Sequence, residues 1–349
     1  MHEEQISRIL VYRLGSIGDF VISLPCFHLL RRQFSNAKIA LLTNQPNDHR
    51  AVPAASVLGN SGLIDRYMTY PLGTRSLRAL MKIRKEIRVY APDLLVYLAA
   101  PRGYFNLLRD ETFFRWWCRI PRILGIPFAR DLRHCRAPQS RHGLWEREAD
   151  RLGRCIGELG SIEAIVPNSW DLRLTTAEIA EADRALNGAD FHGNRPRWLG
   201  LGIGTKQVMK DWGDEKWQAV LSGINDANLG LVLIGAAEER ERSMAVARVW
   251  LGPVVNLCGL LSPRVSAAAL KHMDIFLCND SGPMHLAAAV GTRCVVVFSK
   301  KNLPGQWYPF GTRHEIFYPP PDANSIQAIR PEQVIEAALR AINYSPGDV

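Results

Sequence analysis

The stretch Asp274–Ser299 reads DIFLCNDSGPMHLAAAVGTRCVVVFS and decides the fold. Its apolar start, DIFLC, is typical of a buried strand, and the polar cluster NDSG follows it. Pro283 suits the first turn of a helix, where a missing N–H costs nothing. Met284–Val290 is a compact Ala-rich helix, and Arg293–Phe298 is the next buried strand. This order of strand, polar loop and helix builds an anion site from first-turn N–H groups and the helix dipole.

Three residues of the polar loop are candidates for binding a phosphate group. Gly282 lets the backbone approach a phosphate closely. Ser281 can donate its hydroxyl, and His285, one turn into the helix, can add a ring N–H. The same loop is also consistent with an ordinary capped turn, since Asn, Asp and Ser are common cap residues.

Length and composition indicate a globular protein with two domains. The chain has 349 residues, and a typical domain has about 150–200. Its 47% apolar content is enough for sizeable cores. We find no run of about 18 apolar residues and no apolar signal region, so we expect a cytoplasmic protein that does not span a bilayer. The seven cysteines include no C-x-x-C pair, and we interpret them as reduced core residues.

The formal net charge of +9 indicates an acidic partner. Nucleic acid, an anionic membrane surface, and a phosphorylated or carboxylated substrate all fit this charge.

Strands and helices alternate along the whole chain, which predicts two doubly wound parallel α/β domains. We place the first at residues 1–170 and the second at 171–349, with a loose junction over Ser161–Arg197 and a closing helix over 331–343 that can return toward the first domain. Ligands of such folds bind beyond the carboxyl ends of the strands, so we expect a site in a cleft between the domains. The other expected strands are Ser7–Arg13, Lys38–Leu42, Leu63–Met68, Asp93–Leu98, Trp198–Ile203, Leu229–Ile234 and Val254–Leu257, and the other expected helices are Asp19–Gln33, Ser76–Val89, Leu144–Leu159, Thr176–Leu186, Asp214–Ile224, Glu238–Trp250 and Pro263–Met273, the last capped by Ser262.

The first strand-to-helix turn reads VYRLGSIGD over Val11–Asp19. It lacks the G-x-G-x-x-G spacing, and no acidic residue follows the second strand, so a nicotinamide or flavin site is not favoured. Asp19 is a carboxylate at a helix N-terminus and at the mouth of a sheet. It is either a favourable helix-end charge or a general base held on a rigid element.

The loop after the first strand of the second domain also contains candidate phosphate ligands. Thr205 can hydrogen-bond a phosphate oxygen, and Lys206 and Lys210 can neutralise its charge. The sequence contains no G-K-S/T phosphate loop, no D-x-D pair and no cluster at metal-ligand spacing. Phosphate charge would therefore be met by lysine and helix dipoles, without a metal.

Two adjacent glutamates, Glu238 and Glu239, follow the expected strand Leu229–Ile234. A carboxylate in this position can accept hydrogen bonds from ribose hydroxyls. Both glutamates can equally be helix-start charges, and the sequence leaves these two readings open.

Four motifs in this order resemble those of glycosyltransferase family 9, the ADP-heptose:lipopolysaccharide heptosyltransferases. They are R-x-G-x-x-G-D-x5-P over Arg13–Pro25, T-x4-K-x-W over Thr205–Trp212, G-x3-E over Gly235–Glu239, and N-D-S-G-x-x-H-L-A-A-A over Asn279–Ala289. The resemblance covers nearly the whole chain. It implies the GT-B fold, in which two Rossmann-like domains face each other across a cleft. It also implies an inverting, metal-independent reaction with a nucleotide sugar as substrate and no cofactor.

The resemblance assigns a role to each candidate residue. Asp19 would be the base that takes the proton of the acceptor hydroxyl, and Lys210 would stabilise the nucleoside-diphosphate leaving group. Arg13 would lie near an acidic sugar of the acceptor. The donor side would comprise Thr205, Lys206, Glu238 or Glu239, Asp280, Ser281, Gly282 and His285, and the acceptor side Arg13, Gly18 and Arg102.

The sequence departs from the family pattern at two positions. Lys206 stands where the family has a second hydroxyl residue. The segment Ser299–Pro309, SKKNLPGQWYP, replaces the usual glycine-proline-threonine loop that frames the sugar and the base. The identity of the donor sugar, expected to be heptose from ADP-heptose, is therefore open.

Two basic and aromatic segments lie in the expected acceptor domain, Leu77–Arg88 and the stretch FFRWWCRIPRIL over Phe113–Leu124. They fit peripheral contact with an anionic inner membrane face and a lipid-linked acceptor. Packing with a solvated face is the plainer alternative, and nucleic-acid binding is disfavoured because no recognition module is present. Two functions remain: transfer to a lipopolysaccharide core or other surface glycan, or nucleotide-sugar binding without turnover.

Overall fold

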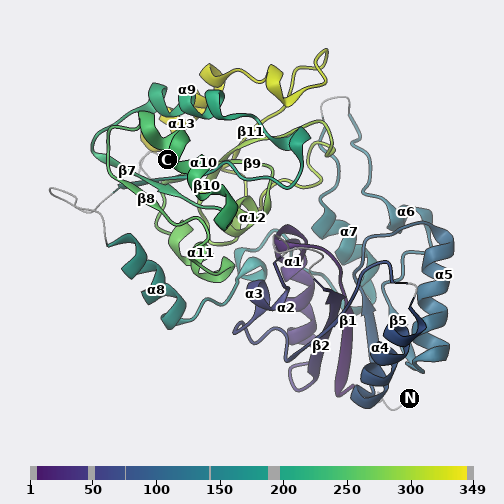
Figure 1. The fold of residues 1–349 in the computed structure, drawn as a ribbon. Coiled ribbons are helices and arrows are strands. Elements are labelled where there is room, and N and C mark those ends of the chain that lie inside the picture. The colour runs from purple at the N-terminus through teal and green to yellow at the C-terminus, as the bar shows by residue number, and fades with distance from the viewer. Residues whose placement is uncertain (1–5, 46–51, 75, 141–142, 188–196, 344–349) are drawn as a thin grey trace. The chain divides into compact units, whose positions relative to one another are not determined.

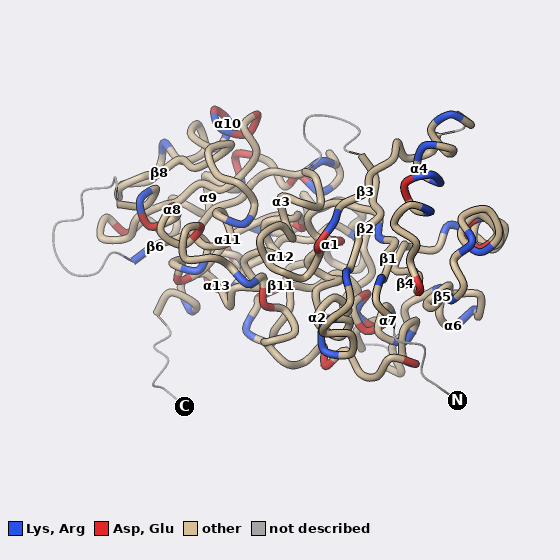
Figure 2. Tube along the Cα trace, turned by 90° about the horizontal axis from the view of Figure 1, so that it is seen from below, with Lys and Arg blue, Asp and Glu red and all other residues tan. Residues whose placement is uncertain are grey.

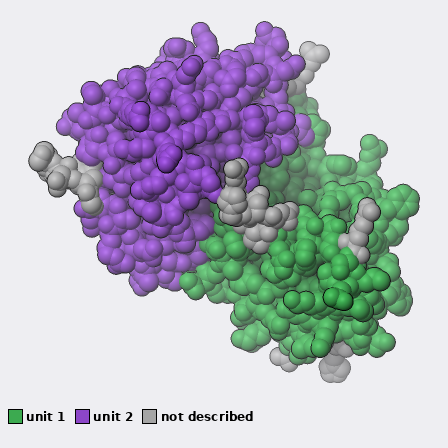
Figure 3. Space-filling view, viewed as in Figure 1, with its two compact units in different colours: residues 1–173, 304–308 green, residues 174–303, 309–349 purple. Residues whose placement is uncertain are grey.

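The computed structural model describes residues 6–45, 52–74, 76–140, 143–187 and 197–343. The chain divides into two compact units, called unit 1 and unit 2 below (Figures 1 and 3). Unit 1 comprises residues 1–173 and 304–308, and unit 2 comprises residues 174–303 and 309–349. Residues 188–196, within the expected junction, lie outside the described residues.

Residues 304–308 belong to unit 1 although they are distant from it in sequence. The N–H of Trp145 donates to the carbonyl of Pro304 at 2.8 Å, and the N–H of Glu148 donates to the carbonyl of Gln306 at 3.0 Å. These two backbone bonds attach the segment to the residues before and at the start of a unit 1 helix.

Unit 1 contains, in its described residues, a five-stranded parallel sheet in the order β3-β2-β1-β4-β5. The first strand, β1, lies at its centre and is almost fully buried. Four strands were predicted, but β5 was not, because a three-residue strand shows no periodicity. The strands are β1 (Arg8–Tyr12), β2 (Lys38–Asn44), β3 (Arg66–Tyr70), β4 (Leu94–Tyr97) and β5 (Arg122–Leu124).

The helices of unit 1 differ from prediction in one place that concerns the site. The single helix expected over Asp19–Gln33 is two helices, α1 and α2, which meet at Ser23. Pro25 has no N–H for an i→i−4 bond, so the continuous helix is interrupted there. The helical segments are α1 (Ile17–Ile22), α2 (Leu24–Gln33), α3 (Ala55–Leu58), α4 (Leu77–Tyr90), α5 (Tyr104–Thr112), the π-helical turn η1 (Phe113–Trp117), α6 (Arg130–Arg133), α7 (Glu148–Cys155), η2 (Gly157–Leu159) and η3 (Pro167–Trp170).

Unit 2 contains, in the part of the chain that is described, a six-stranded parallel sheet in the order β11-β10-β9-β6-β7-β8. Strand β11 was not predicted, for the same reason as β5. Ser262 caps α11 as expected, with its hydroxyl accepting the N–H of Val265 at 3.3 Å. The strands are β6 (Arg197–Gly202), β7 (Leu229–Leu233), β8 (Val254–Asn256), β9 (Ile275–Asn279), β10 (Arg293–Val297) and β11 (Glu315–Phe317), and the helical segments are α8 (Thr176–Leu186), η4 (Val208–Lys210), α9 (Asp214–Ile224), η5 (Ala237–Glu239), α10 (Arg240–Val246), η6 (Ala247–Val249), α11 (Pro263–Leu270), α12 (Gly282–Ala289), η7 (Ile326–Ala328) and α13 (Pro331–Asn343).

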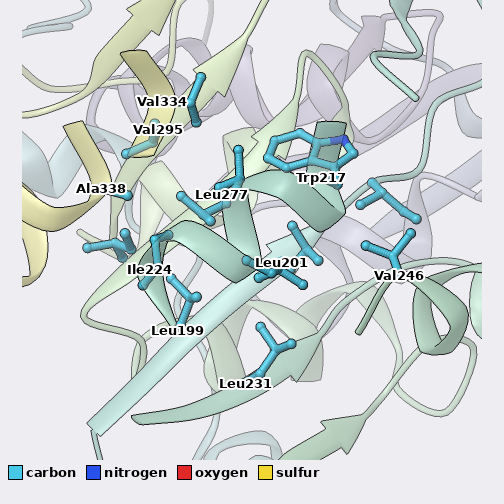
Figure 4. Packing of buried hydrophobic residues seen from close by; sticks show 14 of the residues in the cluster. Leu199, Leu201, Trp217, Ile224, Leu231, Val246, Leu277, Val295, Val334 and Ala338 are labelled. Carbon is cyan, nitrogen blue, oxygen red and sulfur yellow. The ribbon is translucent and has the colours of Figure 1, made fainter. Parts of the chain in front are cut away.

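The core of unit 2 explains where the closing helix lies. Figure 4 shows Leu201 and Leu277 of the sheet together with Trp217 of α9 and Val334 and Ala338 of α13. The sequence left open whether the last helix returns toward the first domain. The structure packs α13 against α9 within the unit 2 core, where its Val and Ala side chains are buried.

The cysteines behave as the sequence predicted. All seven lie in the described residues, and none forms a disulfide; six are buried and Cys155 is partly buried. Burial raises the pKa of the Cys26 thiol to about 12, so the neutral form is favoured. None of the helices in the described ranges has the length and apolar content needed to cross a membrane.

Candidate functional site

The strand order of unit 2 creates a switch point at its carboxyl edge. Strand β6 lies between β7 and β9, so the chain leaves β6 toward one side and returns by β9 on the other. Ligands of open α/β sheets bind at such points. The buried Asn279 side chain joins the two loops there, since its Nδ2 donates to the carbonyl of Ile203 at 2.7 Å.

A short ion pair lies across these same two loops. The Nζ of Lys210, after β6, is 2.6 Å from Oδ2 of Asp280, after β9. Asn302 donates its Nδ2 to the same carboxylate oxygen at 2.6 Å. Burial raises the pKa of Asp280, although the Lys210 charge and the two hydrogen bonds act in the opposite direction. The arrangement holds a lysine ammonium at the carboxyl edge, where it can meet a phosphate.

The loop that carries Lys210 is anchored by the residues that follow the lysine. Trp212, two residues further on, is completely buried and donates its Nε1–H to the carbonyl of Ile329 at 3.2 Å. Arg242 of α10 pairs with Asp211 and with Asp214 at 2.8 and 2.6 Å. Lys210 therefore projects from a turn whose backbone is held by a core residue and an ion-pair network.

The polar loop Asn279–Gly282 leads into α12, as expected. Ser281 is the N-cap residue, but its hydroxyl does not cap the helix. Gly282 is the first helical residue, and both are partly exposed. First-turn N–H groups have no partner within a helix, so they can bind an anion.

His285 is buried beside this turn. Burial, together with the positive charge of Lys210, lowers the pKa of His285 to about 3. The ring is therefore neutral at pH 7, and any contribution it makes to a ligand is a hydrogen bond and not a charge.

Thr205 and Lys206 lie in the loop after β6. The hydroxyl of Thr205 accepts the N–H of Gln207 at 3.3 Å, which forms a local turn. Gln207 in turn binds the Nζ of Lys301, in the segment that departs from the family pattern. Lys206 is exposed.

The two glutamates differ in position. The carboxylate of Glu239 accepts the N–H of Ala236 at 2.8 Å and lies against the backbone of Gly204 and Gly235. A Cβ on either glycine would approach this carboxylate to 2.3 Å or less. Glu239 therefore lies at the ends of β6 and β7, whereas Glu238 is exposed.

In unit 1, Asp19 is held by its own helix start. Its Oδ2 accepts the N–H of Ser16 at 2.9 Å, and its Oδ1 lies 3.3 Å from Nη2 of Arg13. Its side chain keeps 25% of its surface exposed. Gly15 has a φ of +142°, and a Cβ there would come within 2.2 Å of the Asp19 carboxyl carbon. The glycine is thus required by the position of this carboxylate. Asp19 caps its helix and still remains accessible.

Arg13 was expected to contact the acceptor, but its side chain is fully buried. It donates to the carbonyl of Leu98 at 2.7 Å and to the carbonyl of Asp19 at 3.2 Å. Because it has no exposed surface, Arg13 holds Asp19 against the end of β4 and does not offer its guanidinium to a ligand.

The other two acceptor-side candidates lie apart from each other. Gly18 is buried in the first turn of α1. Arg102 is exposed and donates its Nη2 to the hydroxyl of Tyr12 at 3.3 Å. Since successive residues of a strand point to opposite faces, Tyr12 and Arg13 bring Arg102 and Asp19 to different faces of the unit 1 sheet.

Three residues at these sites were not predicted. Asn44 accepts the N–H of Gly15 through its Oδ1 at 2.8 Å, Asn302 binds Asp280, and Arg242 holds the Lys210 loop. The only sequence signal was that Asn302 falls in the divergent segment after β10. Among the described residues, no group of three or more His, Cys, Asp or Glu side chains could hold a metal ion.

Comparison with known proteins shows what the chain is similar to. The model of the family described as "Glycosyltransferase family 9 (heptosyltransferase)" matches residues 165–329. Lipopolysaccharide heptosyltransferase 3 of Escherichia coli is 27% identical over 331 residues, which cover 89% of this chain and 85% of that protein. The chain is therefore similar to glycosyltransferase family 9, as the sequence motifs indicated. It is therefore a glycosyltransferase.

Solved structures support the fold of this glycosyltransferase. A family 9 glycosyltransferase from Veillonella parvula matches with a TM-score of 0.75 at 18% identity, covering 99% of both chains. The E. coli heptosyltransferase WaaC with ADP matches with a TM-score of 0.67 at 15% identity, covering 96% of this chain and 99% of the other. The predicted GT-B class, with two Rossmann-like units, is confirmed. The region matched by the family model contains Lys210, Glu239 and Asp280, while Asp19 lies before it.

Proposed function

We propose that this glycosyltransferase moves heptose from ADP-heptose to the core of a lipopolysaccharide or to a related surface glycan, with inversion and without a metal ion. The names of the similar proteins support the substrate class, since one is a lipopolysaccharide heptosyltransferase and one is a heptosyltransferase solved with ADP. The residues of the two units support the chemistry.

Unit 2 is proposed to bind the donor. Lys210 and the first-turn N–H groups at Ser281 and Gly282 would bind the diphosphate, with Asp280 orienting the ammonium. Glu239, at the ends of β6 and β7, is a better candidate for the ribose hydroxyls than the exposed Glu238. Thr205, Lys206 and His285 remain proposed donor contacts, and the neutral His285 would add a hydrogen bond.

Unit 1 is proposed to bind the acceptor and to supply the base. The carboxylate of Asp19 would take the proton of the acceptor hydroxyl as that oxygen attacks the anomeric carbon. The bond from that carbon to the diphosphate oxygen breaks, and ADP leaves with its new negative charge stabilised by Lys210. Arg13 and Ser16 would position Asp19, and Gly18 and Arg102 remain proposed acceptor-side residues.

The observation that supports this proposal best is the state of Asp19. Its carboxylate is oriented by two donors, yet a quarter of its side-chain surface is accessible. A helix cap needs only the hydrogen bond from the Ser16 N–H. The buried Arg13, which contacts the other carboxylate oxygen, is not required for capping. Peripheral contact with the inner membrane face is part of the proposal, because the acceptor would be lipid-linked.

The test is a transfer assay with ADP-heptose and a heptose-deficient lipopolysaccharide as acceptor. We expect release of ADP, a product heavier by one heptose, and inversion at the anomeric carbon. Binding of ADP-heptose without transfer would favour the alternative of a nucleotide-sugar-binding protein that does not turn over. If transfer occurs only from another nucleotide sugar, the protein is a glycosyltransferase but the proposed donor is wrong.

A further inference from the structure

Unit 1 contains a cavity of about 440 Å³ that none of the assigned roles uses, apart from the candidate acceptor residue Arg102. It lies at the carboxyl ends of β1, β2 and β3, against α4, α5 and η1. A volume of this size is in the range of pockets that hold small organic ligands. The lining residues are Tyr12, Leu42, Tyr70, Gly73, Thr74, Leu80, Ile83, Arg102, Arg109, Asp110, Thr112, Phe113, Phe114 and Trp117.

The interior of this cavity is aromatic and apolar. Tyr12 stacks edge-on against Phe114 with ring centroids 5.1 Å apart, and Phe113 and Trp117 stack edge-on at 5.4 Å. The hydroxyls of Tyr12 and Tyr70 hydrogen-bond each other at 2.6 Å. Because these two hydroxyls already bind each other, the walls mainly offer ring faces and aliphatic carbons. Such walls suit a hydrocarbon chain better than a sugar, whose hydroxyls need partners.

The charged residues of the lining carry a net positive charge. The side chains of Arg102 and Arg109 are 39% and 61% exposed, so both reach solvent. The one carboxylate among them, Asp110, is buried, 2.6 Å from Arg109, and accepts the hydroxyl of Tyr97 at 2.9 Å. Two cations against one anion leave a net charge of +1, which complements a carboxylate or phosphate group.

An exposed apolar stripe runs along the helix that lines the cavity. Phe105 and Trp116 are 85% and 73% exposed, and Leu108 and Thr112 lie between them at helical spacing. Arg109 is on the same exposed face. Large exposed aromatic residues together with arginine are typical of a surface that enters a lipid headgroup layer. The neighbouring helix α4 adds basic residues, drawn in blue in Figure 2.

We propose that the unit 1 cavity binds the acyl chain of an anionic amphiphile, with its carboxylate or phosphate at Arg102 and Arg109. The exposed stripe of α5 and η1 brings the cavity to a lipid surface. The acyl chain can belong to a bilayer lipid or to a monomeric amphiphile, since both carry a hydrocarbon chain and an anionic group. The inference does not rest on the proposed transfer reaction, since binding is measured without the donor.

Calorimetric titration of the whole protein with dodecyl phosphate, below its micelle concentration, tests the cavity. We expect saturable binding with one molecule per chain, weaker binding of dodecyl maltoside, and none of inorganic phosphate. Thr112→Trp, which places an indole at a lining position, should abolish binding. Arg109→Gln should weaken it about tenfold, the equivalent of one charge-assisted hydrogen bond.

Arg115→Gln is the matched control, because Arg115 lies on the next turn, pairs with Glu111 and does not line the cavity. It should bind dodecyl phosphate as the wild type does. ADP should raise the melting temperature of all these variants equally, which separates the cavity from the donor site. Absence of saturable binding in the wild type, or equal binding by Thr112→Trp and Arg109→Gln, would overturn the proposal.

Flotation with phosphatidylglycerol vesicles then identifies the source of the chain. If Thr112→Trp floats less than the wild type, the bound acyl chain belongs to a bilayer lipid. If it floats equally but does not bind dodecyl phosphate, the cavity takes a monomeric amphiphile. Either result supports the shared chemistry of acyl chain and anionic group.

Discussion

Lys210 and Asp280 form a 2.6 Å ion pair between the two loops at the switch point of the unit 2 sheet. Both side chains are largely buried and have lost most of their water, so each charge is stabilised by the other. A phosphate that enters this edge therefore meets an ammonium that is already oriented. The ion pair can therefore be tested by protein stability as well as by turnover.

Lys210→Met should lower kcat by about 100- to 1,000-fold, because a cation at the leaving group acts mainly in the transition state. It should also lower the stability of the protein, since Asp280 loses its cation. The combined variant Lys210→Met/Asp280→Asn should regain most of the stability but not the turnover. Urea unfolding and ADP release measure the two effects. A double variant as unstable as the single one would mean that the ion pair is not the cause.

Asp19→Asn should lower kcat by about 100- to 10,000-fold, the usual contribution of a general base. The amide keeps the shape of the side chain and an oxygen that can accept the Ser16 N–H, so the fold should survive. Nucleotide affinity should not change. Asp93→Asn is the control, because Asp93 also accepts backbone N–H groups in unit 1, from Ser7 and Arg8. Unchanged turnover in Asp19→Asn would refute its role as base.

Gly15→Ala should destabilise the protein by about 1–3 kcal/mol and impair turnover. The new methyl group would both strain the backbone at a φ of +142° and collide with the Asp19 carboxyl group. Gly62→Ala gives the matched control in the same unit, since Gly62 also has a positive φ but its Cβ would meet nothing closer than 3.9 Å. Thermal unfolding should show a lower melting temperature for both variants. Steady-state assays should show lost turnover only for Gly15→Ala.

His285 should make the protein less stable as the pH falls from 6.5 toward 5. Its pKa is about 3 in the folded state and near 6.5 when unfolded, so the unfolded chain binds the extra proton in this window. The loss is about 1.4 kcal/mol for each pH unit. His285→Gln should therefore show a flatter dependence of unfolding free energy on pH. The raised pKa of Asp280 acts in the opposite sense, but it is common to both proteins and leaves the comparison intact.

Treatment with a chelator should leave the transfer rate unchanged. In the proposed mechanism the positive charge at the diphosphate comes from Lys210 and the first turn of α12, so no metal ion takes part. The assay is run with EDTA and again after addition of Mg²⁺. A rate that falls with EDTA and recovers with Mg²⁺ would contradict this part of the mechanism.

Much of the fold could be predicted because its signals are local. Apolar runs marked the long strands, and α9 was predicted with its observed bounds, Asp214–Ile224. The strands β5 and β11 were missed because three residues are too few to show a hydrophobic period. Each is extended because it pairs with a neighbouring strand, β4 or β10. The break at Ser23 was missed because the apolar pattern continues through it.

By itself, the sequence determined the α/β alternation, the family motifs and the residue types at each strand end, all of which depend on neighbours along the chain. Only the tertiary structure decided that Arg13 is buried behind Asp19, that Asp280 pairs with Lys210 and Asn302, and that Glu239 lies inward of Glu238. Several of these relations join loops that are far apart in sequence, such as Lys210 with Asp280 and Arg13 with Leu98. The order of parallel strands brings such loops to one edge, and no local pattern encodes which side chains then meet.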